Sequence, residues 1–145
     1  MNLEEYSRCD GVALADLVRK REVSPKELAH LFVEAVEKVN PRINAVIEVY
    51  FDRIEGLDDH AISAGPFAGV PFLMKDVGAA DSGRRQESGS RIMKGYVADH
   101  DSFLTTLFKK AGLTLLSRTT TPEFALGIST ESALTGVTRN PWNLD

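Results

Sequence analysis

The amino-acid sequence predicts an α/β fold built on a mixed or parallel β-sheet. Two N-terminal segments carry the apolar repeat of amphipathic helices. A third helical segment, residues 103–111, ends at Gly112 and is followed at once by the β-rich segment 113–117. A helix, a glycine stop and a strand in this order form the αβ unit from which such sheets are assembled. The composition is that of a globular protein, with 145 residues, 43% hydrophobic and 26% charged.

The first two helices are predicted from their caps and apolar spacing. Residues 11–21 follow Asp10, which is expected to be the N-cap. Residues 24–27 read Ser-Pro-Lys-Glu, a capping box with proline at the first helical position. Apolar residues then recur on one helical face. The proline of the Asn-Pro pair at 40–41 is expected to stop this second helix.

The third helix is predicted to start after Asp99 or Asp101. Five apolar side chains recur along it at helical spacing, and we expect them to face the core: Phe103, Leu104, Leu107, Phe108 and Ala111.

Two further strands are expected upstream of that helix. Residues 43–50 are β-rich, and residues 67–76 are an apolar run that ends in two charges, Lys75 and Asp76. A continuous apolar run is typical of a strand covered on both faces. Residues 52–65 are expected to form a loop with at most one helical turn, in which Asp58, Asp59 and His60 are solvated rather than metal-bound.

Two further regions are predicted to be loops, because both are rich in glycine and hydroxyl residues and lack helical or strand periodicity. Residues 77–97 form a predicted loop of about twenty residues, and loops of this length inside compact domains are usually functional or disordered. Residues 118–145 lack a long periodic segment and are rich in small hydroxyl residues and turn formers.

Composition argues against several classes of function. The net charge of −4 and the scattered basic residues disfavour nucleic acid as a partner. Cys9 is the only cysteine and the three histidines are scattered, so a zinc site is not expected. No segment approaches the roughly 20 apolar residues that span a bilayer, and no secretory signal is evident. We therefore expect a cytoplasmic protein with no membrane segment and no zinc site.

Lys75 is the candidate catalytic residue. At the end of a buried strand its ammonium would be desolvated, which lowers the pKa of a lysine and makes a neutral amine available as a proton acceptor. The alternative is a structural lysine whose stem packs and whose head reaches water or pairs with Asp76. The residues alone leave both interpretations open.

Hydroxyl residues supply candidate partners for that amine. Ser90, in the run 88–90, and Ser129 and Ser132, in the run 129–132, are the serines considered. Turn and cap chemistry is the alternative explanation for both runs.

Four segments resemble motifs of the amidase signature family. Residues 69–76 (Gly-Val-Pro-Phe-Leu-Met-Lys-Asp) resemble its Gly-Val/Ile-Pro-x-x-x-Lys-Asp segment, and residues 117–127 resemble its Gly-Lys-Thr-Asn-x-x-Glu-Phe-Ala-x-Gly segment. Residues 129–143 resemble the stretch that follows. Residues 95–101 are similar to amidases of the 6-aminohexanoate-cyclic-dimer hydrolase type. The resemblance covers essentially the whole chain, with the motifs in the family's order.

The resemblance implies a fold and an activity. The fold is the N-terminal part of an amidase signature fold, a mixed β-sheet flanked by helices, with residues 1–145 forming part of a single domain. The activity is hydrolysis of the C–N bond of a small-molecule amide by a Ser–cis-Ser–Lys triad, with Lys75 as the base and no cofactor. Gly127, Ser129 and Thr130 are candidate substrate-binding residues.

The resemblance also implies that the sequence is truncated. In the family, the Gly-Gly-Ser-Ser-Gly-Gly and Asp-x-Gly-Gly-Ser segments carry the two serines and follow the stretch that residues 129–143 resemble. This sequence stops at Asp145 and contains neither segment. We therefore expect a fragment that carries only Lys75 of the triad and is inactive by itself. Within the matched segments, Arg118 stands where the family usually has Lys and Thr120 where it usually has Asn.

Two alternatives to an amidase fragment remain open. One is a non-catalytic interaction or oligomerisation fragment that self-associates through an exposed sheet edge. The other is a stand-alone hydrolase that pairs Lys75 with Ser90, Ser129 or Ser132.

Overall fold

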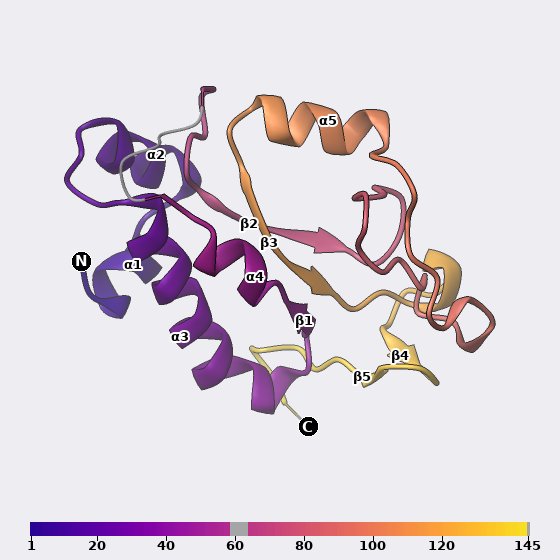
Figure 1. Ribbon diagram of the computed structural model, residues 1–145. Helices are drawn as coiled ribbons and strands as arrows, with labels where there is room; N and C mark the ends of the chain where they lie inside the picture. Colours follow the sequence, from indigo (N-terminus) through magenta and orange to yellow (C-terminus); the bar gives the residue numbers. More distant parts are fainter. Residues whose placement is uncertain (59–63, 145) are drawn as a thin grey trace.

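A central β-sheet lies between helices in the computed structural model, which describes residues 1–58 and 64–144 (Figure 1). Asp59 and His60, of the predicted solvated loop, lie outside the described residues. The α/β class predicted from the sequence is confirmed, because the sheet has both parallel and antiparallel pairs.

Three helices form the N-terminal part: α1 (Leu3–Arg8), α2 (Gly11–Arg19) and α3 (Pro25–Ile43). Asp10 caps α2 and Ser24 caps α3 through the predicted capping box. Helix α1 was not predicted, because its six residues are too short for a recognisable apolar repeat.

The predicted end of α3 at Asn40-Pro41 is wrong. The helix continues to Ile43 and ends at Asn44, which adopts the left-handed conformation at φ 51°. Pro41 lies in the last turn, where its missing N–H costs one intrahelical hydrogen bond. The Asn40 side-chain oxygen accepts the N–H groups of Ala45 and Val46, each at 2.8 Å, and so turns the chain into the next strand.

The sheet has the order β1-β3-β2. Strand β3 (Thr114–Thr119) is central; β1 (Val46–Val49) pairs with it antiparallel, and β2 (Pro71–Lys75) pairs with it parallel. Helix α4 (Phe51–Glu55), the helical turn allowed for in the sequence, lies between β1 and β2 in the chain.

The hydrophobic core has two clusters, and one of them lies between α3, α4 and β3. Phe32 of α3, Ile54 of α4 and Leu116 of β3 pack together and are buried. A second cluster joins α2 and the start of α3 to Val70, just before β2. No helix within 1–58 and 64–144 is long and apolar enough to cross a bilayer.

Helix α5 (Phe103–Lys110) was predicted in the right place but with the wrong face inward. Its N-cap is Ser102, and only Thr105 is buried. Phe103 is 79% exposed, and Leu104 and Leu107 are also exposed, contrary to expectation.

Helix α5 is instead held through mostly polar contacts. Thr105 donates to the carbonyl of Ala80 at 2.5 Å, and Lys109 pairs with Asp81 at 3.0 Å. Phe108 adds a ring contact with Phe72, and the two centroids are 4.8 Å apart. The helix therefore turns polar groups towards the protein and leaves much of its apolar surface uncovered.

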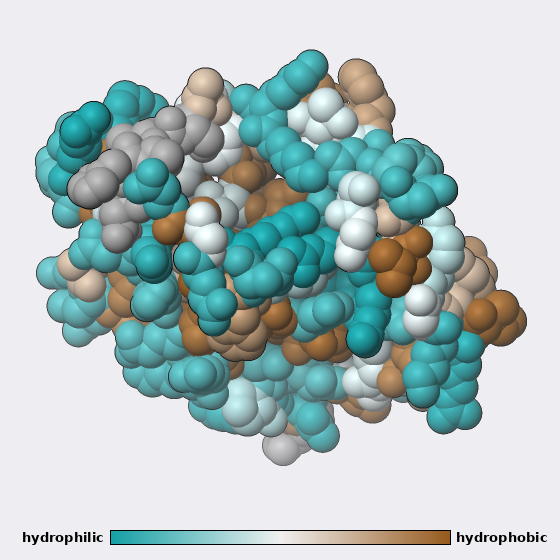
Figure 2. Space-filling model, viewed as in Figure 1, coloured by the Kyte–Doolittle hydropathy of each residue, from teal (hydrophilic) through white to brown (hydrophobic). Residues whose placement is uncertain are grey.

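The remaining elements are short: η1 (Arg91–Met93), η2 (Glu123–Ala125) and the antiparallel pair β4 (Glu131–Ser132) and β5 (Gly136–Val137). Figure 2 shows hydrophobic atoms reaching the surface at the right-hand end of the molecule, where η2 and the loop after β2 lie. Exposed large apolar residues of these segments include Ile92, Leu126 and Ile128.

Candidate active site

Lys75 ends β2, and its backbone pairs with Thr119 of β3. The lysine side chain is exposed and has no hydrogen bond or ion pair with the described residues. The expectation that β2 is covered on both faces and shields this amine is therefore wrong. The reason is that only one face of β2 is covered by the described residues: Met74 on that face is buried, whereas Leu73 and Lys75 on the other face are exposed.

Asp76, which follows Lys75, is buried and does not pair with it. Its carboxylate accepts the N–H of Glu87 at 2.7 Å and the N–H of Gly89 at 2.9 Å. It also accepts a hydrogen bond from Nη1 of Arg118 at 2.9 Å. Of the structural alternative for Lys75, the pairing with Asp76 is therefore wrong, whereas a side chain that reaches water is what the structure has.

Arg118 is the centre of a buried ion cluster. Its side chain is 5% exposed, and its Nη1 donates to Oε2 of Glu87 at 2.7 Å as well as to Asp76. Its Nε donates to Glu48 of the neighbouring strand at 3.1 Å. One guanidinium thus joins carboxylates from β1, from the end of β2 and from the following loop. Charge-assisted hydrogen bonds of this kind are the strong ones in a protein interior.

Electrostatics within the cluster favour its charged forms. Burial by itself would raise the pKa of Glu87, but the Gly95 N–H and the Arg118 guanidinium outweigh burial and lower that pKa. For Arg118, burial would lower the pKa, and the hydrogen bonds with Glu87 and Asp76 raise it. Each partner thus keeps the other ionised.

Acid should destabilise the protein partly through Glu87. Because its folded pKa lies below the ordinary value of 4.5, ionised Glu87 stabilises the fold above that pH. This stability is lost as the pH falls through the lower folded pKa. We expect the free energy of unfolding, measured with urea, to fall less between pH 7 and about pH 3 in Glu87→Gln than in the wild type. Equal losses in the two proteins would contradict this prediction.

Residues 87–90 form a tight turn, which we call the connecting turn, between the end of β2 and the C-terminal segments. The Ser88 N–H donates to the carbonyl of Asp76 at 2.9 Å, and the Ser88 carbonyl accepts the N–H of Phe124 at 2.8 Å. The Ser90 hydroxyl donates to Glu123 at 2.6 Å. The Ser132 hydroxyl donates to the carbonyl of Gly89.

An open groove of about 580 Å³ lies beside the connecting turn. Its walls are largely apolar, with two carboxylates, and it contains two of the candidate substrate-binding residues, Gly127 and Ser129. The third candidate, Thr130, does not line it. The lining residues are Ile92, Pro122, Glu123, Phe124, Leu126, Gly127, Ser129 and Glu131.

The candidate serines differ in their environment. Ser90 and Ser132 are buried, and each hydroxyl donates to an acceptor, a carboxylate for Ser90 and a carbonyl for Ser132. Both also accept backbone N–H groups. These are the turn and cap roles that formed the alternative interpretation of the sequence. Ser129 is exposed on the groove.

A second ion cluster lies elsewhere, between α4 and α5. Arg53 contacts both carboxylate oxygens of buried Asp81, at 2.6 and 3.0 Å, and Lys109 is 3.0 Å from the same carboxylate. Burial raises the pKa of Tyr50 beside it to about 12, and the charge of Glu48 adds to the shift. Within the described residues, no group of three or more His, Cys, Asp or Glu side chains is arranged to hold a metal ion.

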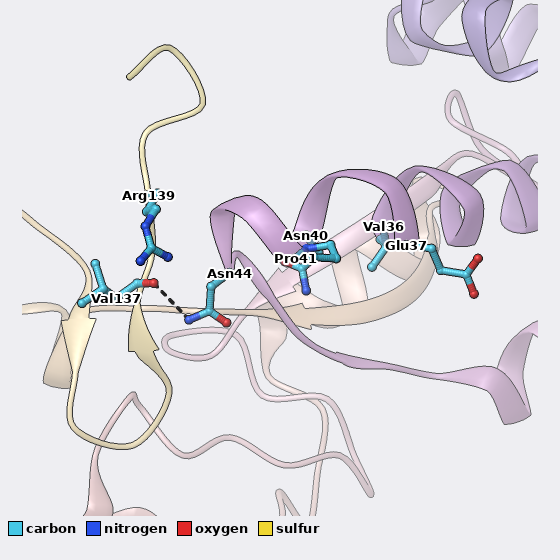
Figure 3. Close-up of a pocket in the computed structure, with 7 residues that line it drawn as sticks. All are labelled: Val36, Glu37, Asn40, Pro41, Asn44, Val137 and Arg139. Carbon is cyan, nitrogen blue, oxygen red and sulfur yellow. Dashed lines mark hydrogen bonds between the residues drawn. The ribbon is translucent and has the colours of Figure 1, made fainter. Parts of the chain in front are cut away.

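Another groove, of about 590 Å³, lies between the C-terminal end of α3 and β5 (Figure 3). Asn44, the C-cap of α3, donates to the carbonyl of Val137 at 3.1 Å, and Arg139 lies on the same segment as Val137. This groove contains none of the candidate site residues.

Arg118 and Glu87 are the site residues that sequence reasoning missed. The only signal was that Arg118 occupies a position where the resembling motif has another cation. Its carboxylate partners are 31, 42 and 70 residues away in the sequence, so no local pattern joins them.

The chain is similar to known amidases along most of its length. The family model described as Amidase matches residues 27–145. The 6-aminohexanoate-cyclic-dimer hydrolase of Paenarthrobacter ureafaciens is 42% identical over 137 residues, which cover 93% of this chain and 27% of that protein. The protein of the same name from Pseudomonas sp. (strain NK87) is also 42% identical over 137 residues, with the same two shares covered, 93% and 27%.

Solved structures give the same result. The structure of 6-aminohexanoate cyclic dimer hydrolase complexed with substrate has a TM-score of 0.86 and 42% identity, covering 94% of this chain and 28% of that one. A bacterial aryl acylamidase has a TM-score of 0.79 and 29% identity, with 94% of this chain and 30% of that one covered. The chain thus spans about a quarter of the length of the curated relatives that it matches.

Proposed function

The chain belongs to the amidase signature family, and we propose that it forms the N-terminal part of a single amidase domain that hydrolyses carboxamide C–N bonds. The observation that carries the proposal is the placement of Lys75. It lies at the end of a sheet strand, directly before Asp76 of the buried ion cluster, and this cluster holds a turn whose partners Glu123 and Phe124 line an open groove. A lysine on a rigid strand, tied through such a turn to a groove, is a suitable arrangement for an acid–base residue.

In the proposed reaction Lys75 is the base of a Ser–cis-Ser–Lys triad. Its neutral amine accepts a proton relayed through the first serine from the hydroxyl of the second. That oxygen attacks the amide carbon, and backbone N–H groups stabilise the resulting oxyanion. The C–N bond breaks and the amine leaves with a proton. Water then hydrolyses the ester, which returns the serine and releases the acid.

The groove beside the connecting turn is proposed to bind the substrate. Gly127 and Ser129 line it, and Thr130 is adjacent to it in the sequence. Its mostly apolar walls suit the aliphatic or aromatic part of a small amide. Similarity to a cyclic-dimer hydrolase and to an aryl acylamidase supports a small-molecule amide as substrate. The proposed location is the cytoplasm, a reducing compartment in which the free thiol of Cys9 stays reduced.

Amide hydrolysis tests the proposal. The product of the complete gene should release amine or ammonia from at least one amide in a panel of linear, cyclic and aryl amides. Residues 1–145 alone should release none, because the two family serines are proposed to come from later segments. A complete product that is inactive on the whole panel, or equal activity of residues 1–145, would contradict the proposal.

A second candidate function, self-association, is favoured by the uncovered apolar surface. Strand β2 is at the edge of the sheet, and Leu73 on it is 36% exposed. Edge strands pair readily with other chains.

Self-association through β2 should be measurable in residues 1–145. Sedimentation equilibrium should show a concentration-dependent dimer that weakens when Leu73→Lys charges the edge. Val12→Lys, which charges an exposed apolar position on α2, is the matched control and should not weaken it. A monomer at all concentrations would exclude this function.

A further inference from the structure

We propose that Arg118 is a positioning residue that holds Lys75 in a fixed relation to the groove, by clamping the connecting turn between them. The clamp itself is a structural device of this chain. Its catalytic consequence rests on the proposed function.

The first half of the clamp joins the turn to the end of β2. Asp76 follows Lys75 directly, and its two carboxylate oxygens accept the N–H groups of Glu87 and Gly89. Arg118 donates to the same carboxylate and to that of Glu87. The position of the Lys75 backbone is thereby tied to the turn on both sides of Ser88.

The second half joins the turn to the groove. The Ser90 hydroxyl donates to Glu123, and the Ser88 carbonyl accepts the Phe124 N–H. Glu123 and Phe124 both line the groove. A shift of the turn would therefore move the groove wall relative to Lys75.

The positive charge of Arg118 offsets the repulsion between the Asp76 and Glu87 carboxylates. Asp76 is completely buried and Glu87 nearly so, and two carboxylates this close repel each other unless a cation lies between them. Removing one partner of a buried ion pair leaves an uncompensated charge, which is strongly unfavourable. Without Arg118 the turn would have to open and hydrate these carboxylates.

The kinetic test compares Arg118→Met with Arg118→Lys in the product of the complete gene. A displacement of about 1 Å costs on the order of 10²-fold in rate. We therefore expect Arg118→Met to lower kcat by about 10²-fold and to change KM much less. Arg118→Lys keeps the charge and should recover part of kcat, since an ammonium can still lie between the two carboxylates but does not reproduce the hydrogen bonds of the guanidinium.

Arg53→Met is the matched control for a purely structural effect. Arg53 also pairs with a buried carboxylate, that of Asp81, but within the described part of the chain it makes no hydrogen bond to the connecting turn. The Arg53→Met variant should have a lower free energy of unfolding than the wild type and the same kcat in its folded state. If Arg53→Met and Arg118→Met lower kcat equally, the positioning role is excluded.

A second measurement on residues 1–145 does not depend on catalysis. Amide hydrogen exchange in Arg118→Met should rise at least about tenfold more for Glu87 and Gly89 than for core amides such as Leu116, because the opening is local. A uniform rise, or none, would overturn the proposal. If the wild-type complete protein hydrolyses no amide, the proposed function fails, and this exchange result alone decides the clamp.

Discussion

Replacing Lys75 by methionine in the product of the complete gene is expected to reduce amide hydrolysis by about 10²- to 10⁴-fold, the range that general acid–base groups contribute. The side chain is exposed and has no partner among the described residues, so its removal should leave the fold intact. Methionine keeps the apolar stem and removes only the amine. The effect should appear in kcat, with the unfolding transition unchanged.

Lys110→Met is the matched control for Lys75→Met. Lys110 is an exposed lysine on α5, and its loss removes the same charge away from the connecting turn. It should hydrolyse amides at the wild-type rate. A Lys75→Met protein that is as active as Lys110→Met would show that Lys75 is a surface lysine.

Gly89→Ala is expected to destabilise the protein by about 3 kcal/mol, since left-handed strain costs about 1–2 kcal/mol and overpacking about 1–3 kcal/mol. Gly89 has φ +62°, and a Cβ there would lie 2.6 Å from the carbonyl oxygen of buried Thr121. That backbone cannot retreat, because Thr121 lies just beyond the end of β3. Urea unfolding of residues 1–145 measures the loss.

Gly83→Ala is the control that separates the two contributions to the destabilisation expected for Gly89→Ala, the steric clash and the left-handed strain. Gly83 also has a positive φ, +77°, but a Cβ there would meet nothing within 4 Å. This variant should lose only about 1 kcal/mol. Equal losses at the two glycines would mean that the connecting turn is not packed as described.

The elements that could be predicted from the sequence are those determined by neighbouring residues. The Asp10 and Ser24 caps need only the next three residues, and the αβ unit needs only the glycine between α5 and β3. The continuation of α3 through Pro41 could not be predicted, because it depends on the side chain of Asn40 reaching Ala45 and Val46.

The burial of the α5 face and of Lys75 could not be predicted from the sequence. The apolar spacing of α5 predicted its helix correctly, but Phe103 and Leu107 are exposed because the helix is anchored through Thr105 and Lys109. Lys75 was expected to be shielded because apolar residues precede it. Its exposure follows from the uncovered face of β2 on which it lies with Leu73, and the covering of a face depends on the packing of distant elements and not on local sequence.

Only the part of the candidate site that consists of local motifs could be predicted from the sequence. Lys75 and the hydroxyl segments form local motifs, so they could be singled out. The cluster around Arg118 joins residues that only the folded chain brings together.

Amine rescue tests most directly whether Lys75 is the proton acceptor. In a Lys75→Ala variant of the complete gene product, added methylamine should restore part of the lost amide hydrolysis, in proportion to the concentration of neutral amine. Tetramethylammonium, which cannot accept a proton, should restore none. Wild-type activity of Lys75→Ala without any added amine, or equal rescue by tetramethylammonium, would contradict the assignment.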